Sequence, residues 1–304
     1  MPERIQTASG REVNRILVSI DGHRIAADVH LRADDPRPPV VFLHGIMTSL
    51  AIANELFLDP ESESWIAISL PGHSPGAFAA GFAPEAIDAA LFATLIERSL
   101  EQVIGDRPVV AAGWSMGGFA ALTLAILEPR RVVAVASLAG FAQGRCSGAI
   151  GWLQWLAGGA VGNGPLRAGL WAAGRIPLLH DLFVRLGAAD GAAGAAVPED
   201  VLSRLRDDFS RHDPAALAAL LAAIHRLDIT PRLAEIRVPA WIVGGGRDPF
   251  VPREETERIA AGIPAAILRI HESAGHLFFS EWPGVREDFA VWRDSLPDTK
   301  PVFR

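Results

Sequence analysis

Short apolar runs alternate with longer amphipathic segments along most of this chain. Dense apolar runs of a few residues predict buried strands. In the first half of the chain these runs are 15–20, 24–30, 40–43, 65–70, 109–112 and 132–138. Residues 86–103 and 116–127 have apolar positions at helical spacing instead. Because strands alternate with helices, we expect crossover connections and a mostly parallel sheet with helices on both faces.

This rhythm stops at Gly140 and resumes at Pro239. The intervening sequence is rich in Gly, Trp and Ala, and it ends in a helix that Asp213 caps and Pro214 begins. We interpret residues 141–230 as a helical lid inserted after the sixth strand. The core then comprises residues 1–140 and 231–304. Its second part is expected to contain strands 240–243 and 266–271, a helix over 253–261 and a final helix over 283–296.

Composition narrows the class of protein. A chain of 304 residues can bury one large core with an insertion. A net charge of −7 offers no basic surface, so we expect no nucleic-acid partner. The single cysteine, Cys146, excludes an internal disulfide framework and favours a reducing, cytoplasmic location. No secretory leader is visible at the start. Residues 108–127 are apolar enough for a membrane span, but their glycines favour a buried strand and helix, so no transmembrane segment is expected.

The most informative motif joins one predicted strand to the next helix. The apolar run 109–112 leads into Gly113-Trp114-Ser115-Met116-Gly117, and a helical pattern follows at once. Such a sequence is typical of a nucleophile elbow, where a serine projects from a sharp turn between strand and helix. The two glycines suit a turn whose backbone segments approach closely. Ser115 is therefore the candidate nucleophile.

A serine nucleophile needs a base within hydrogen-bond reach and an acid that orients the base. Asp248 follows the predicted strand 240–243, and His276 follows the predicted strand 266–271. Catalytic groups in open α/β sheets gather at the carboxyl ends of the strands. We therefore predict that His276 is the base and Asp248 the orienting acid. An Asx-turn role for Asp248 before Pro249 is the alternative for that residue.

An oxyanion needs two backbone N–H donors that point at one position. Met116, directly after the nucleophile, should supply one. The loop after strand 40–43 should supply the second, which we assign to Ile46. Trp114, Trp152 and Trp155 are candidate substrate-binding residues, although Trp152 and Trp155 could equally form the lid's own core.

The chain resembles the α/β-hydrolase superfamily over essentially its whole length. Four ordered features carry the resemblance: Leu43-His44-Gly45, the Gly-Trp-Ser-Met-Gly-Gly elbow, Asp248 within Gly-Arg-Asp-Pro, and Gly275-His276. The resemblance implies an α/β-hydrolase fold and the same roles for Ser115, Asp248, His276, Ile46 and Met116. The wording of the elbow is similar to that of small carboxylesterases. No cofactor or metal is expected, since the histidines lack ligand spacing and the glycine run before Asp248 lacks a phosphate-loop lysine.

We therefore expect a serine hydrolase that cleaves a small-molecule carboxylic ester with a largely apolar acyl group. Three alternatives stay open: an acyltransferase or thioesterase using the same acyl-enzyme, a carbon–carbon bond hydrolase, and a non-catalytic binding protein on the same fold. An apolar lid can also serve as a dimer surface, which leaves a homodimer open.

Overall fold

Nine strands of the part of the chain that the structure describes form one sheet. The structure, a computed structural model, describes residues 3–7, 10, 12–58, 63–146, 148–159, 161–189, 199–282 and 284–297. The strands are β1 (Glu3–Gln6), β2 (Glu12–Ile20), β3 (His23–His30), β4 (Val40–Leu43), β5 (Trp65–Ile68), β6 (Val109–Trp114), β7 (Val132–Leu138), β8 (Ala240–Gly245) and β9 (Ala266–His271). Their order in the sheet is β1-β2-β3-β5-β4-β6-β7-β8-β9. The strands from β5 to β9 in that order pair in parallel, whereas β1, β2 and β3 pair antiparallel.

The helices complete the alternation that the sequence predicts. The α-helices are α1 (Ala89–Ile104), α2 (Met116–Leu127), α3 (Gly148–Gly158), α4 (Asn163–Ala173), α5 (Pro177–Arg185), α6 (Glu199–Ser210), α7 (Pro214–Ile224), α8 (Arg253–Gly262), α9 (Phe278–Glu281) and α10 (Val285–Asp294). A π-helix, η1 (Ile52–Phe57), and a 3-10 helix, η2 (Pro84–Ala86), precede α1, and a second 3-10 helix, η3 (Thr230–Glu235), lies between α7 and β8.

Several predicted boundaries are corrected. The sequence analysis does not predict the strand β1. The insertion expected over 141–230 therefore follows the seventh strand of the chain and not the sixth. The helix expected over 86–103 begins only at Ala89, because Asp88 accepts a hydrogen bond from the Leu91 amide and caps it there. The strand expected over 109–112 continues to Trp114. The last helix begins at Val285, and Pro283 lies outside the described residues.

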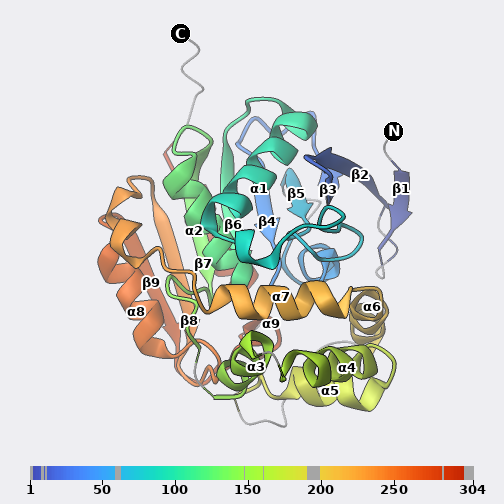
Figure 1. Cartoon of the computed structure of the whole chain (residues 1–304). Helices are drawn as coiled ribbons and strands as arrows, with labels where there is room; N and C mark the ends of the chain where they lie inside the picture. The colour runs from blue at the N-terminus through green and yellow to red at the C-terminus, as the bar shows by residue number, and fades with distance from the viewer. Residues whose placement is uncertain are drawn as a thin grey trace.

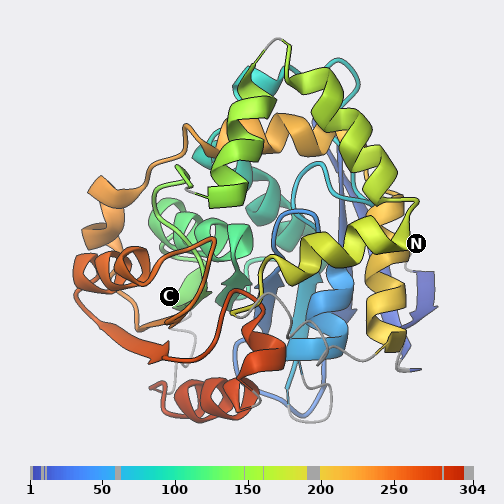
Figure 2. The ribbon, with the colours of Figure 1, turned by 90° about the horizontal axis from the view of Figure 1, so that it is seen from below.

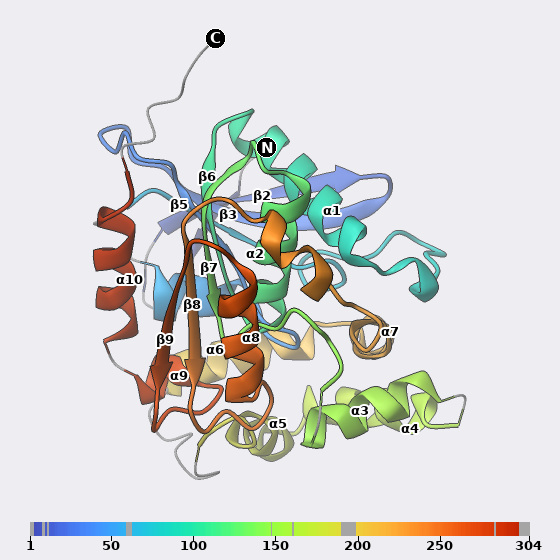
Figure 3. The ribbon, with the colours of Figure 1, turned by 90° about the vertical axis from the view of Figure 1, so that its left-hand side faces the viewer.

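Helices cover both faces of the sheet (Figure 3). One face packs against α1, α2 and α8 around a buried cluster that includes Phe92, Phe119 and Ile259. The other face packs against η1 and α10, where Trp241 and Trp292 stack. The residues of α2 are apolar all round and nearly all buried, as expected for a helix that crosses the centre of a core. This two-sided packing fixes the carboxyl ends of β6, β8 and β9. The loops that carry Ser115, Asp248 and His276 follow these three ends.

The helices α3 to α7 come between β7 and β8 and form a separate layer at one end of the molecule (Figure 1). Seen from below, α3, α4 and α5 lie nearest the viewer and frame the centre of the molecule (Figure 2). The helix α7 packs against α3 and α4, and its start is capped by the Asp213 side chain as predicted. A small apolar cluster inside this layer also includes Met47 of the loop after β4. The layer is therefore packed onto a loop of the core.

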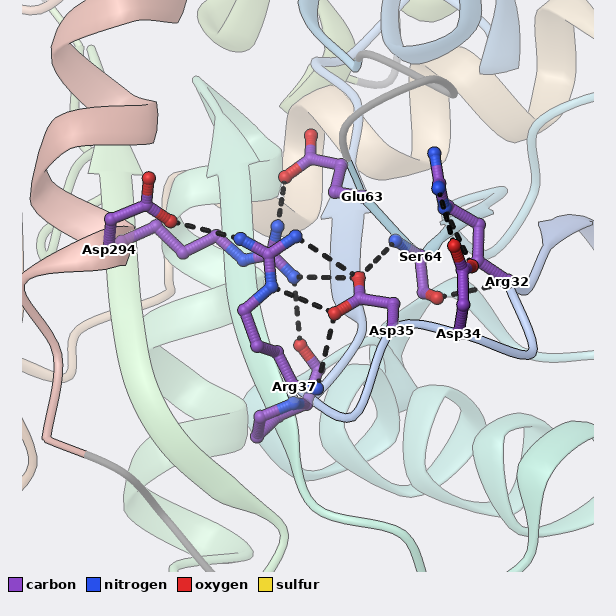
Figure 4. A network of polar contacts seen from close by, with 9 residues as sticks. Arg32, Asp34, Asp35, Arg37, Glu63, Ser64 and Asp294 are labelled. Carbon is purple, nitrogen blue, oxygen red and sulfur yellow. Dashed lines mark hydrogen bonds and ion pairs between the residues drawn. The ribbon is translucent and has the colours of Figure 1, made fainter.

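A polar network fastens the last helix to the core (Figure 4). Arg37 donates to Asp35 at 2.8 Å and to Asp294 of α10 at 2.9 Å. Burial alone would raise the pKa of Asp35, but hydrogen bonds from Arg37 and from the Ser64 amide outweigh it and lower that pKa to about 2. Asp35 is therefore an anion at neutral pH, and it links the β3–β4 connection to α10 through Arg37.

Candidate active site

Ser115 lies on a strained turn between β6 and α2. Its backbone has φ 56° and ψ −120°, in the region that residues other than glycine seldom adopt. A Cβ on Gly113 would overlap the carbonyl of Gly117, and a Cβ on Gly117 would overlap the carbonyl of Leu43. The two glycines of the motif are thus required by the close approach of β6, α2 and the end of β4. The serine side chain stands at the N-terminus of α2, where the helix dipole favours negative charge.

Asp248 and His276 come together from the loops after β8 and β9. Asp248 Oδ2 lies 2.7 Å from His276 Nδ1, and both side chains are buried. The other carboxylate oxygen, Oδ1, accepts hydrogen bonds from the amides of Phe250 and Val251 at 2.8 and 2.9 Å. Asp248 therefore forms the Asx turn that was the alternative for this residue and contacts His276 at the same time. Two backbone amides hold Oδ1 and the imidazole contacts Oδ2, so the carboxylate is fixed and holds the imidazole in one orientation.

Ser115 and His276 line one cavity. Most of its other lining side chains are apolar, and they come from the core and from the helices between β7 and β8. They are Ile46, Trp114, Phe141, Ile150, Phe183, Val184, Leu221, Ile224, Phe250, Val251 and Leu277, with Thr48 and Cys146 as the polar remainder. Burial raises the pKa of the Cys146 thiol to about 11, so this cysteine is a neutral wall residue at pH 7. The cavity suits an apolar group placed against Ser115.

Trp114 is both a wall of this cavity and a support for the histidine. Its indole Nε1 donates to the carbonyl oxygen of His276 at 3.1 Å, and the two rings lie 5.2 Å apart. Gly45 packs against the other part of the indole, where a Cβ would lie 2.9 Å from a ring carbon. The residue before the serine thus joins the elbow, the loop after β4 and the histidine loop.

The loop after β4 is held by buried histidines. His44 Nε2 accepts from the Leu70 amide, and His73 Nε2 accepts from the Met47 amide, each at 3.1 Å. Burial lowers the pKa of His44 to about 3 and the pKa of His73 well below its usual value, so both rings are neutral acceptors. Met47 adopts φ 63°, and its N–H is directed at His73. These contacts hold Ile46, between Gly45 and Met47, beside the elbow.

A third histidine connects this loop to the helical layer, and sequence reasoning missed it. His212, between α6 and α7, accepts from the Ser74 amide at 3.0 Å and lies 3.1 Å from the Thr48 carbonyl through its other nitrogen. Burial lowers the pKa of His212 to about 4. Ser49 also donates to Asp208 of α6 at 2.6 Å. No local pattern could signal these pairs, because their members are about half the chain apart.

Glu281 is a second residue that the sequence did not suggest. Its carboxylate accepts from the Gly275 amide at 2.8 Å and from the Ala189 amide at 2.9 Å. The His276 amide donates to the Gly187 carbonyl at 2.7 Å. The histidine loop is therefore anchored to the segment after α5, and the helical layer helps to set the position of His276.

Trp152 and Trp155 are not where the sequence analysis expects them. Both are largely exposed, and neither is among the residues that line the cavity of Ser115. The helix α3 turns Gln154 inward, where it hydrogen-bonds to the Gly144 carbonyl and the Cys146 amide, and this rotation carries the two tryptophans outward. Neither the pocket role nor the lid-core role of these tryptophans is supported, whereas Trp114 does line the cavity.

Comparison with known proteins defines the class. The fold and the relatives are those of a serine hydrolase of the carboxylesterase type. A model of the alpha/beta hydrolase family matches residues 40–287, and the chain belongs to that family. The chain is 31% identical over 215 residues to a pimeloyl-[acyl-carrier protein] methyl ester esterase of Neisseria meningitidis, an alignment covering 70% of this chain and 76% of the relative. It is 30% identical to a 2-hydroxy-6-oxononadienedioate/2-hydroxy-6-oxononatrienedioate hydrolase of Pseudomonas putida, over 61% of each chain.

Solved structures show the same fold at low sequence identity. The enol-lactonase of Burkholderia xenovorans superposes with a TM-score of 0.71 at 18% identity, covering 91% of this chain and 99% of that one. Est816, described as an N-acyl homoserine lactone degrading enzyme, superposes with a TM-score of 0.67 at 22% identity, covering 92% and 100%. In the described part of the chain, no helix is both long and apolar enough to cross a bilayer.

Proposed function

We propose that this protein cleaves a carboxylic ester with a largely apolar acyl group through a covalent acyl-enzyme. The observation that carries the proposal is the shared cavity: a serine on a strained elbow faces the same apolar space as a histidine bonded to a buried aspartate. The helices between β7 and β8 act as a lid in this proposal, since Ile150 and Phe183 form part of the cavity wall.

The proposed reaction uses side chains and backbone amides of the chain together with one water molecule. His276 takes the proton of the Ser115 hydroxyl, and the serine oxygen attacks the ester carbonyl carbon. The N–H groups of Ile46 and Met116 stabilise the oxyanion that forms. Collapse breaks the bond to the alcohol, which receives the proton from His276. A water molecule, deprotonated by His276, then attacks the acyl-enzyme and releases the acid and Ser115.

Two features support the N–H assignments. Met116 is the first residue of α2, so its amide has no partner one turn earlier in the helix. The amides of Met47 and Thr48 already donate to His73 and to the Gly45 carbonyl, whereas Ile46 lines the cavity together with Ser115. Both assignments predict that the donors act through the backbone, so side-chain substitution of Ile46 would change cavity shape more than oxyanion binding.

The apolar cavity favours an ester over the substrate of a carbon–carbon hydrolase. The Pseudomonas putida relative acts, by its name, on dioates, which carry two carboxylates. Among the described residues that line the cavity of Ser115, no lysine or arginine is present. A dianion in this site would lack a charged partner, and burying an unpaired charge is costly.

The test is hydrolysis of p-nitrophenyl esters from acetate to palmitate by the wild type, Ser115→Ala and a control, Ser295→Ala, whose serine is exposed at the end of α10. We expect turnover that peaks at one chain length, loss of at least about a thousandfold in Ser115→Ala, and unchanged turnover in the control. Turnover that survives Ser115→Ala would refute the mechanism. A large gain in product with an added alcohol or thiol would indicate acyl transfer instead.

A further inference from the structure

The helices α3, α4 and α5 present an unusual outer surface. Between residues 150 and 189, every exposed residue that the structure describes is apolar, glycine, proline or arginine. The large apolar members of this surface, which we call the outer apolar face, are Trp152, Trp155, Val161, Trp171, Ile176, Leu178, Leu179, Leu182 and Leu186. Trp155 is 70% exposed and Leu178 is 75% exposed. Scattered apolar side chains are normal on a protein surface, but their concentration on three consecutive helices that contact one another in pairs indicates a binding surface.

Packing does not require this arrangement. In α3 the polar Gln154 is buried and the apolar Trp152 and Trp155 point away from the core, with their rings stacked 6.5 Å apart. A helix that only served the fold would place its tryptophans inward. The outward tryptophans therefore need a partner that the core does not provide.

The charges on this surface have one sign. The exposed charged residues between 150 and 189, within the described part, are Arg167, Arg175 and Arg185. Arg175 lies over the ring of Trp171, 4.2 Å from its centroid. The acid Asp181 is half-buried and bound by Arg206 of α6. Because the whole chain carries −7, this positive face is a local feature that complements an anionic partner.

We propose that the outer apolar face docks on an anionic phospholipid bilayer. Tryptophan and leucine side chains beside arginines are the composition of surfaces that lie in the bilayer interface, with the apolar groups among the acyl chains and the cations at the headgroups. A second copy of the chain is a poorer occupant, since a two-fold contact would bring the arginines of both copies together. The opposite side of the same helices supplies Ile150, Phe183 and Val184 to the cavity of Ser115.

Docking on a bilayer also indicates the class of substrate: esters that partition into membranes. This part of the inference rests on the proposed function. The helices that contact the bilayer also form the cavity wall, so an apolar ester would have a short path from lipid to Ser115. Membrane binding itself does not depend on catalysis, so the two proposals can fail separately.

The experiment is flotation of the full chain with vesicles of phosphatidylcholine mixed with phosphatidylglycerol, and with phosphatidylcholine alone. We expect binding to the mixed vesicles, weakened by salt, with a blue shift of tryptophan fluorescence. The triple variant Trp152→Ala, Trp155→Ala and Trp171→Ala should lose at least about tenfold in binding, and Arg167→Gln about fivefold. Matched controls on other surfaces, Val291→Ala and Arg237→Gln, should bind as the wild type does.

Activity is measured separately with a short, water-soluble ester. The triple tryptophan variant should keep that activity, and Ser115→Ala should lose it while still floating with the vesicles. A folded wild type that does not bind the mixed vesicles would overturn the proposal. So would a dimer that the tryptophan variants dissociate without any binding to lipid, or binding to an acidic carrier protein but not to vesicles.

Discussion

The core around Ser115 and the helices α3 to α5 follow opposite rules. In the core, apolar side chains point inward, and the polar groups near the serine hold one another: Asp248 binds His276, and His73 binds the Met47 amide. On α3, a buried glutamine lies inward and tryptophans lie outward. The difference indicates that the first region is organised to hold a fixed geometry, whereas the second keeps an apolar surface for contact with something else.

The largest effect on activity is expected when the contact between Asp248 and His276 is broken. Asp248→Asn should lower kcat/KM for p-nitrophenyl esters by about 10⁴-fold, because an amide cannot hold the imidazole in the tautomer that accepts the serine proton. Asp207→Asn, at an exposed position of α6, is the matched control. Steady-state kinetics of both variants decide the point. If Asp248→Asn kept a tenth of the activity, the carboxylate would be only a turn residue.

Glycines in the two regions should respond differently to the same change. Gly117→Ala places a Cβ into the Leu43 carbonyl, and both groups belong to backbone, so we expect a loss of about 4 kcal/mol or failure to fold. Gly169→Ala in α4 meets no atom within 4 Å and should gain about 0.5–1 kcal/mol from helix propensity. Urea unfolding of the two variants measures the contrast. Equal effects would contradict the close packing of the elbow.

The junction between the two regions should be sensitive to acid. His212 has its pKa lowered to about 4 by burial, below the ordinary value of 6.5. The unfolded chain therefore binds a proton that the folded chain does not, and stability falls as pH drops from 6.5 toward 4, by up to about 1.4 kcal/mol per pH unit. Above pH 6.5 this contribution is fully present.

The measurement is the free energy of unfolding of the wild type and His212→Ala at several pH values between 7.5 and 4.5. The variant should be less stable at pH 7.5, since the Ser74 amide and the Thr48 carbonyl lose their partner. Other titratable groups contribute equally to both proteins, so the difference in the free energy of unfolding reports His212 alone. This difference should shrink as the pH falls, because only the wild type loses the stabilisation that the neutral His212 provides. A constant difference would show that His212 does not titrate with unfolding.

The smallest effect is expected on the outer apolar face. Trp155→Ala should change the free energy of unfolding by less than about 0.5 kcal/mol, because the side chain is mostly exposed. Trp241→Ala, at a fully buried position against α10, should cost about 3–5 kcal/mol. Thermal or urea unfolding compares the two. A large loss in Trp155→Ala would mean that this tryptophan serves the fold.

The sequence by itself determined the elements of the core and the identities of the residues around Ser115. Strong periodicity predicted α2 and β7 with their observed ends. Five consecutive residues, with Gly113 and Gly117 at their ends, predicted the sharp turn that carries Ser115. Asp248 and His276 could be placed because both follow strands, and parallel strands end at one edge of a sheet. Local patterns were sufficient wherever local geometry fixes the chemistry.

Tertiary structure alone decided which side of α3 and of α5 faces the core. In α3 and α5 large apolar side chains lie both in the wall of the cavity and on the outer face, and α3 buries a glutamine, so apolar character alone does not tell which side faces the core. The contacts of His212 with Ser74 and of Glu281 with Ala189 join distant segments that have no shared motif. Such pairs arise only when the chain packs, because hydrogen-bond partners are selected by proximity in space and not by order in the sequence.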